Sequence, residues 1–126
     1  MKKDWNYHRG DVYLANLNPY VGSEQGGTRP VLVLQNNSGN FFSPTLIVAP
    51  ITSRSWKKAS QPTHCILKGT DFLRGDDMVL LEQITTIDKR RVHKYLGAVS
   101  REQMAEVDEA VVASLGLYIP EMVEFP

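Results

Sequence analysis

The stretch from Val12 to Gln35 reads VYLANLNPYVGSEQGGTRPVLVLQ, and it carries the clearest indication of the fold. Its two ends, Val12–Leu17 and Val31–Gln35, are rich in aliphatic residues and have ordinary strand length. Between them, Asn18–Pro30 holds three glycines, two prolines and a cluster of hydrogen-bonding side chains. About a dozen residues is longer than the usual hairpin loop of roughly 2–5. We therefore expect two strands joined by a loop that is either functional or simply long and solvated.

More strand-like segments follow this stretch along the chain. Turn-forming residues separate them, most clearly in Asn36–Asn40, Ser43–Pro44 and Arg74–Asp77, all of which we predict to be turns or loops. Short strands without long alternating helices predict a compact antiparallel sheet or a small β-barrel. The additional predicted strands are Leu46–Ile51, Thr63–Leu67, Met78–Leu81, Ile84–Ile87 and Tyr95–Val99.

One convincing helix is predicted at the C-terminal end of this series. Ser100 and Gln103 have the spacing of a capping box, in which each side chain satisfies a free backbone N–H at the helix start. Gly116 is a suitable residue to end the helix. The apolar positions recur at helical spacing and predict a stripe that packs on the core. This stripe consists of Met104, Val107, Val111 and Leu115.

Length and composition indicate a soluble domain without a membrane segment. The 126 residues fit one domain, 1–126, and 42% of them are hydrophobic. No apolar run approaches the roughly 18 residues of a membrane span, and the polar start Met1–Gly10 is not a signal peptide. The single cysteine, Cys65, fits a reducing compartment and is expected to be a buried strand residue. We expect a cytoplasmic protein.

The charge balance argues against nucleic-acid binding through bulk electrostatics. Fourteen basic and fourteen acidic side chains cancel, so any nucleic-acid site must be local. The acids gather after Ser100, whereas basic residues cluster in Arg54–Lys58 and Lys89–Lys94. The chain has no HExxH, no CxxC pair, no GxSxG and no GxxxxGK[ST] motif. We accordingly expect neither a metal nor a cofactor.

Several motifs of the chain resemble those of the MazF/PemK (Kid-like) toxins of bacterial type II toxin–antitoxin systems. The similarity covers about residues 9–117, and the long, chemically mixed loop motif is its most specific part. The matching segments are Arg9–Tyr13, Asn18–Pro19, Gly22–Pro30, Gln35–Asn36, Val48–Ser53, Val79–Ile84 and Thr86–Lys89. The resemblance implies an SH3-like small β-barrel of the CcdB/MazF type, mainly β with one C-terminal α-helix, which pairs as a homodimer.

The same resemblance implies an endoribonuclease that cuts single-stranded RNA and is held inactive by a cognate antitoxin. Arg29 and Thr52 would be its catalytic pair. Arg54 stands beside Trp56, Lys57 and Lys58, a combination that suits phosphate and base contacts but equally an ordinary solvated loop. The expected RNA-binding residues are Ser23, Glu24, Gln25, Arg54 and Gln83.

RNA chemistry explains how so few groups could suffice. The ribose 2′-hydroxyl is an internal nucleophile beside the scissile phosphate, so the enzyme must only align it and stabilise charge. A guanidinium such as that of Arg29 can hold two phosphate oxygens, and the Thr52 hydroxyl can donate to the same phosphate. The expected products are a 2′,3′-cyclic phosphate and a 5′-hydroxyl.

Other interpretations stay open at this point. Arg29 by itself could be an ion-pair partner, and Thr52 could be purely structural. His8, His64 and His93 offer imidazoles for acid–base catalysis, a less favoured mechanism. At the level of function, the rivals are a non-catalytic toxin on the same fold that binds DNA gyrase and a plain interaction module of SH3-like shape.

Overall fold

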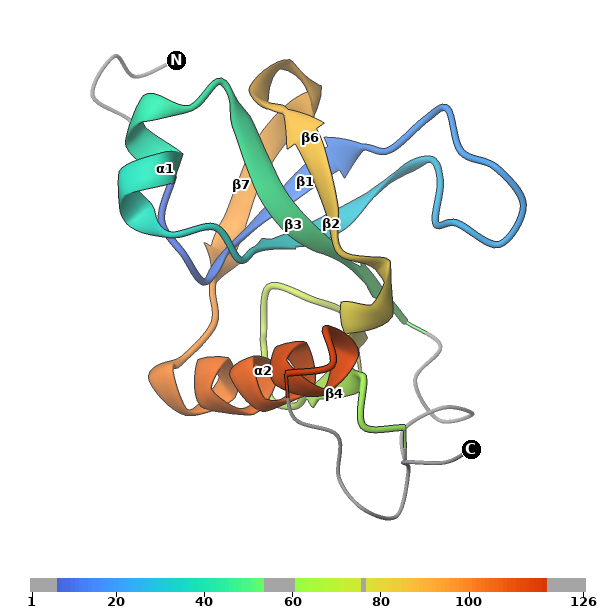
Figure 1. Cartoon of the computed structure of the whole chain (residues 1–126), viewed down its shortest axis with the longest axis vertical. Coiled ribbons are helices and arrows are strands. Elements are labelled where there is room, and N and C mark those ends of the chain that lie inside the picture. Colours follow the sequence, from blue (N-terminus) through green and yellow to red (C-terminus); the bar gives the residue numbers. More distant parts are fainter. Residues whose placement is uncertain (1–6, 54–60, 76, 118–126) are drawn as a thin grey trace.

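The computed structural model of the chain describes residues 7–53, 61–75 and 77–117. It consists of a seven-stranded antiparallel sheet with a long helix near the C-terminal end of the described chain (Figure 1). The strands are β1 Asp11–Asn16, β2 Thr28–Val33, β3 Thr45–Thr52, β4 His64–Leu67, β5 Asp77–Leu80, β6 Thr85–Asp88 and β7 Val92–Ala98. The helices are α1 Asn37–Phe42 and α2 Arg101–Ser114, with short 3-10 turns η1 Leu81–Gln83 and η2 Lys89–Arg91.

The long strand β3 organises the sheet. One of its edges pairs with β2, while its other edge pairs first with β6 and then, toward Thr52, with β5. The strand order is β4-β5-β3-β2-β1-β7, with β6 beside β3. The predicted fold class, mainly β with one long C-terminal helix, is confirmed, and the bent sheet is of small-barrel type although β4 and β7 remain edges.

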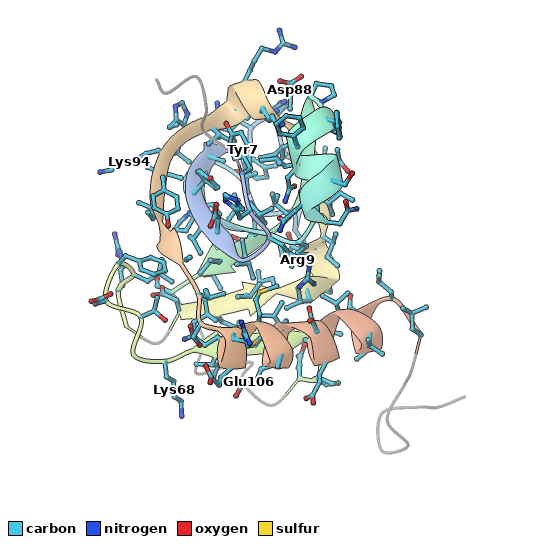
Figure 2. All side chains as sticks on the ribbon, turned by 90° about the vertical axis from the view of Figure 1, so that its left-hand side faces the viewer. Tyr7, Arg9, Lys68, Asp88, Lys94 and Glu106 are labelled. Carbon is cyan, nitrogen blue, oxygen red and sulfur yellow. The ribbon has the colours of Figure 1, made fainter. Side chains whose placement is uncertain are left out.

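Strand alternation divides the core into two clusters on opposite faces of the sheet. On one face, Leu32, Ala49 and Ile51 pack together with Val107 of α2. On the other face, Val31, Val33 and Val48 pack with Leu46, Tyr13, Ala15 and Ile87. Figure 2 shows α2 running along one side of the sheet. Because successive residues of a strand point to opposite faces, the two clusters show to which face of the sheet each residue of β2 and β3 points.

Helix α2 begins and ends as its sequence predicts. The Ser100 hydroxyl accepts from the Gln103 N–H at 3.0 Å, and the Gln103 side chain accepts from the Ser100 N–H at 2.9 Å. Gly116 has a φ of +76°, and the N–H groups of Gly116 and Leu117 donate to carbonyls of the last turn. This is a Schellman motif. Leu115 is the exception to the predicted stripe, since it is 59% exposed.

Two predictions about the local structure were wrong. Residues Asn36–Asn40 were expected to be a turn, yet α1 begins at Asn37 because the Asn36 side chain caps it by accepting from the Gly39 N–H at 2.8 Å. The segment up to Pro30 was expected to be loop, yet β2 already begins at Thr28. Pro30 is tolerated because the β2–β3 register ends at Val31, so no β3 residue pairs with it.

The structure also bears on two further predictions, the burial of Cys65 and the lack of a membrane-spanning segment. Cys65 lies in β4 and is 6% exposed, which confirms the prediction of a buried strand residue. Within the described residues, no helix has the length and apolar character needed to cross a membrane.

Candidate active site

The loop between β1 and β2 is held together at its base. The Leu17 N–H donates to the Gly27 carbonyl at 2.9 Å, and the Gly27 N–H donates to the Asn18 side chain at 2.8 Å. Arg91 of η2 donates to the carbonyls of Asn16 and Asn18. Gly27 has a φ of +75°, which favours glycine at this position. The loop is therefore tied to the sheet and differs from the simple solvated hairpin that composition alone would allow.

The tip of this loop is attached to η1 through Gln83. The Gln25 N–H donates to the Gln83 side-chain oxygen at 2.8 Å, and the Gln83 amide nitrogen donates to the Ser23 carbonyl at 3.4 Å. The Glu24 carboxylate accepts from the Val21 N–H at 2.8 Å, which closes a local turn. Four of the residues predicted to bind RNA thus lie together, although Gln83 is 58 residues from Gln25 in the chain.

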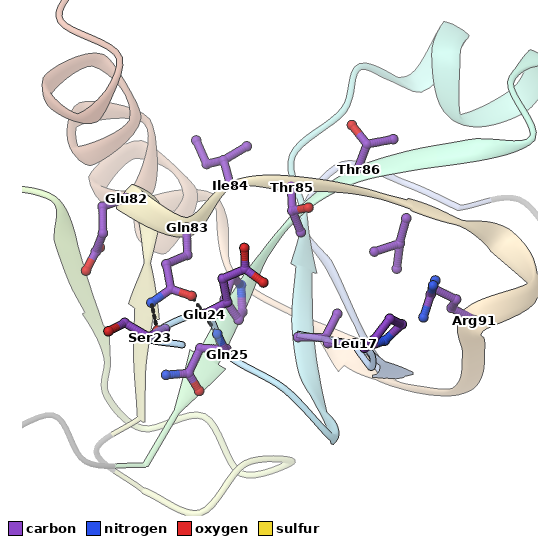
Figure 3. Close-up of a pocket in the computed structure, with 13 residues that line it drawn as sticks. Leu17, Ser23, Glu24, Gln25, Glu82, Gln83, Ile84, Thr85, Thr86 and Arg91 are labelled. Carbon is purple, nitrogen blue, oxygen red and sulfur yellow. Dashed lines mark hydrogen bonds between the residues drawn. The ribbon is translucent and has the colours of Figure 1, made fainter. Parts of the chain in front are cut away.

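A cavity of about 520 Å³ opens between this loop and the segment η1–β6 (Figure 3). Its size lies within the range of roughly 300–1,000 Å³ that is typical of ligand sites. Its wall consists of five neutral polar side chains, five apolar ones, two glutamates and one arginine. The lining residues are Leu17, Pro19, Ser23, Glu24, Gln25, Pro50, Glu82, Gln83, Ile84, Thr85, Thr86, Ile87 and Arg91.

Arg29 lies in β2 beside this loop, opposite Ala15 of β1. Its Nε donates to the Gly26 carbonyl at 2.9 Å, which fixes the guanidinium against the loop. Its terminal nitrogens form no hydrogen bond or ion pair with any other residue that the structure describes. The ion-pair role that Arg29 could have had on sequence grounds is therefore absent from this part of the chain. A fixed guanidinium with two free nitrogens is suited to bind an oxyanion.

Thr52 is the last residue of β3 and is partly buried. The β2–β3 register pairs Val31 with Pro50 and Leu32 with Ala49. Extending this register by two residues brings Arg29 opposite Thr52, and residues opposite each other in an antiparallel pair point to the same face.

A smaller cavity joins Arg29 to the loop. It measures about 470 Å³ and includes Tyr20, whose ring packs so closely on Gly26 that a Cβ at this glycine would come within 1.9 Å of it. The lining residues are Asn18, Tyr20, Glu24, Gln25, Gly26, Gly27 and Arg29. The guanidinium thus forms one wall of a hollow whose other wall is the predicted RNA-binding loop.

Two other reactive side chains, those of Cys65 and His64, do not line these two cavities. Burial, together with the nearby Glu106 and Glu109, raises the pKa of the Cys65 thiol to about 11, so the thiolate nucleophile is scarce near neutral pH. The His64 side chain is fully buried, and its Nε2 lies 2.7 Å from Glu82 Oε2. Among the described residues, no three His, Cys, Asp or Glu side chains form a group that could hold a metal ion.

The structure describes most of the predicted site residues but not all of them. Arg54 and its neighbour Trp56 lie outside the described residues. Two further residues that shape the site were not predicted. Arg91 holds the base of the loop, and the basic run of which it is part was its only signal in the sequence. Tyr20 packs on Gly26, a contact for which the sequence offers no signal.

Replacing Gln83 by alanine is expected to lower the affinity of the site for its ligand about fivefold without unfolding the protein. Both contacts of Gln83 go to backbone atoms of the loop tip, and a net hydrogen bond contributes about 1 kcal/mol. The Kd for a labelled single-stranded RNA, measured by fluorescence anisotropy, checks the result. Thr86→Ala, which removes a cavity-lining side chain that does not hold the loop, is the control. An unchanged Kd for the Gln83 variant contradicts the prediction.

The fold and the site together define a class of protein: a small antiparallel β domain in which a polar, glycine-rich loop holds the Nε of an arginine whose terminal nitrogens have no partner among the described residues. Comparison with known families makes the class specific. Residues 8–115 match the family of PemK-like, MazF-like toxins of type II toxin–antitoxin systems, and the chain belongs to this family.

Solved structures agree with this classification. The chain is similar to MazF from Deinococcus radiodurans, with 29% identity and a TM-score of 0.77 over 90% of this chain and 99% of the other. It is also similar to an endoribonuclease from a mycobacterial species in complex with its cognate antitoxin, with 27% identity and a TM-score of 0.75 over 90% and 99% of the two chains. MazF in a MazE–MazF complex from Deinococcus radiodurans matches at 28% identity and a TM-score of 0.71 over 91% and 100%.

Proposed function

We propose that the chain is an endoribonuclease toxin that cleaves single-stranded RNA, messenger RNA in particular, at specific sequences and without a metal ion. The Arg29 guanidinium carries this proposal, because its Nε is fixed by Gly26 while its terminal nitrogens have no partner in the described residues. Membership of the toxin family and similarity to proteins described as endoribonucleases support it. With messenger RNA as the substrate, the protein acts in the cytoplasm.

The proposed reaction uses the substrate's own nucleophile. The ribose 2′-oxygen attacks the adjacent phosphorus, a new O–P bond forms, and the bond from phosphorus to the 5′-oxygen breaks. Water takes the proton from the 2′-hydroxyl and returns one to the leaving 5′-oxygen, so the products are a 2′,3′-cyclic phosphate and a 5′-hydroxyl. Arg29 stabilises the charge that builds on the phosphate oxygens, and it does not transfer protons because a guanidinium does not readily lose one.

Thr52 and the loop complete the proposed site. In this proposal the Thr52 hydroxyl donates to the phosphate that Arg29 holds. Extension of the β2–β3 register, which brings the two residues opposite each other on one face of the sheet, supports this. Ser23, Glu24, Gln25 and Gln83 line the first cavity, and we assign Gln83 to the surface that reads the bases. Neutral amides and hydroxyls in such a cavity match the hydrogen-bonding edges of unpaired bases.

The proposed partners are a second copy of the chain and a cognate antitoxin. The mycobacterial endoribonuclease and the Deinococcus MazF named above both occur in complexes with antitoxins. An antitoxin with a disordered acidic segment could cover the cavity and the Arg29 guanidinium, and such a segment would order on binding.

One experiment tests the proposed reaction. Purified protein is incubated with a long, weakly structured RNA in EDTA, and the 5′ ends of the fragments are mapped. We expect cleavage at one short sequence, with cyclic phosphate ends. A substrate with a single 2′-deoxyribose at the mapped site should stay whole, because it lacks the nucleophile. Intact RNA with folded protein would refute the nuclease assignment and favour a toxin that acts by binding, such as the gyrase-binding class.

A further inference from the structure

A second large cavity lies on the other side of Arg29, on the face of the sheet opposite the first. It measures about 510 Å³ and is formed where the segment between β4 and β5 folds over strands β1, β2, β3 and β7. Arg29 borders this cavity as well as the smaller one at the loop. The lining residues are Leu14, Thr28, Arg29, Pro30, Ile51, Ser53, Asp71, Phe72, Leu73, Arg74, Asp77 and Leu96.

The chemistry of this cavity combines an apolar floor with two arginines, Arg29 and Arg74, and two aspartates, Asp71 and Asp77. Leu14, Phe72 and Leu96 supply the apolar surface. Arg74 is exposed, and its guanidinium forms no hydrogen bond or ion pair with any residue that the structure describes. The buried Asp77 forms no ion pair with this guanidinium; its carboxylate accepts instead from the Arg74 and Gly75 N–H groups at 2.8 and 3.1 Å.

The segment that carries Arg74 is fixed to its surroundings. The Phe72 ring packs on β7 so tightly that a Cβ at Gly97 would come within 2.4 Å of it. The Gln103 side chain at the start of α2 donates to Thr70 Oγ1 at 3.0 Å and to the Lys68 carbonyl at 3.1 Å. Arg74 is therefore presented from an anchored segment at the rim of a preformed cavity.

We propose that this cavity binds the nucleotide next to the scissile phosphate and that Arg74 contacts the phosphate of this nucleotide. The inference rests on the proposed function. Arg29 is the second residue of β2 and borders both the loop cavity and this one, so a single strand whose scissile phosphate lies at Arg29 can pass around the end of β2 into this cavity. Grooves for single-stranded nucleic acid pair cations for the backbone with apolar surface for sugars and bases. This cavity offers both, in Arg29 and Arg74 and in its apolar floor, beside two aspartates. Arg74 is thus inferred to extend the RNA-binding surface by one nucleotide beyond the scissile phosphate.

A scan of neutral linkages tests this contact. In a short RNA that contains the mapped cleavage site, each phosphate near the scissile one is replaced in turn by an uncharged methylphosphonate. For the wild-type protein, we expect one flanking replacement to raise KM about tenfold, as for loss of a charge-assisted hydrogen bond. Arg74→Ala should raise KM for the unmodified RNA by a similar factor, with kcat nearly unchanged. The KM of this variant should not rise further when that same flanking phosphate is replaced by a methylphosphonate.

The matched control is Arg90→Ala. Arg90 lies in η2, its side chain is 90% exposed, and it lines none of the three cavities described here, so its removal reports the general effect of losing one positive charge. Arg74→Gln keeps polarity and length in case alanine destabilises the segment. If both Arg74 variants are folded and keep wild-type KM, or respond to every replacement as the wild type does, the inference is overturned.

The outcome is separable from that of the proposed function. RNA binding is measured in parallel by anisotropy, with no cleavage required. If the wild-type protein binds RNA in an Arg74-dependent manner but does not cut it, the nuclease proposal fails while the contact stands. If it cuts RNA and binding does not depend on Arg74, the contact fails while the nuclease proposal stands.

Discussion

Replacing Arg29 by alanine is expected to lower kcat for RNA cleavage by about a hundred- to a thousandfold, the usual effect of removing one donor that stabilises a developing oxyanion. The fold should survive. The described contacts of the Arg29 side chain comprise one hydrogen bond, to the Gly26 carbonyl, and no ion pair. Loss of that bond should reduce the free energy of unfolding by about 1 kcal/mol.

Three conservative variants separate the roles that we assign to the pair. Arg29→Lys keeps the charge but loses the planar fork, so we expect intermediate activity. Thr52→Val removes the hydroxyl while keeping a branched side chain, and Thr52→Ser keeps the hydroxyl, so only the first should be strongly impaired. Single-turnover rates at saturating RNA, with thermal unfolding as the fold control, measure these effects. A folded Arg29→Ala protein with the wild-type rate would remove Arg29 from the mechanism.

Much of the sheet could be predicted because the local sequence of its strands is typical of β structure. Runs such as Leu46–Ile51 are apolar and β-branched, and β3 is found at Thr45–Thr52. Helix α2 was predictable at both ends, since a capping box and a Schellman glycine act within a few residues. These signals depend on backbone hydrogen bonds between near neighbours, and they do not require knowledge of the tertiary structure.

The misplaced elements depend on contacts that local patterns do not contain. Asn36 reads as a turn residue, yet the same side chain caps α1, and the buried Asn40 donates to the Gln35 carbonyl at 2.9 Å. Pro30 reads as a strand breaker, but the end of the β2–β3 register leaves room for it. In both cases, the neighbouring elements decide between two structures that the residue itself permits.

The candidate site likewise combines features that local sequence predicts with features that depend on tertiary contacts. The loop Gly22–Pro30 could be singled out because its length and glycines are unusual, and the family resemblance assigned roles to its residues. The sequence could not show that Gln83 holds the loop tip or that the terminal nitrogens of Arg29 lack a partner in the part of the chain that the structure describes. Nor could it reveal the cavity at Arg74, which forms only where four strands and a connecting segment meet.

Replacing Gly26 by alanine should impair cleavage by up to about a hundredfold, although the residue neither touches the proposed substrate nor needs a positive φ. A Cβ here would lie 1.9 Å from Tyr20 Cδ1 and 2.4 Å from Tyr20 Cγ, so either the ring or the loop backbone must move. The Gly26 carbonyl holds Arg29 Nε, so movement of this backbone displaces the guanidinium. A displacement of about 1 Å in a catalytic group can reduce the rate about a hundredfold.

The double variant Tyr20→Ala with Gly26→Ala shows whether this clash is the cause. Tyr20 is 53% exposed, so Tyr20→Ala alone should reduce activity only slightly, and it creates the space that the new methyl group needs. We therefore expect the double variant to cleave RNA faster than Gly26→Ala alone, a strong coupling of the kind that contacting residues show. If the two losses instead add, the ring is not what holds the Gly26 carbonyl in place, and the position of Arg29 must depend on its strand, through the pairing of β2 with β1, and not on the loop.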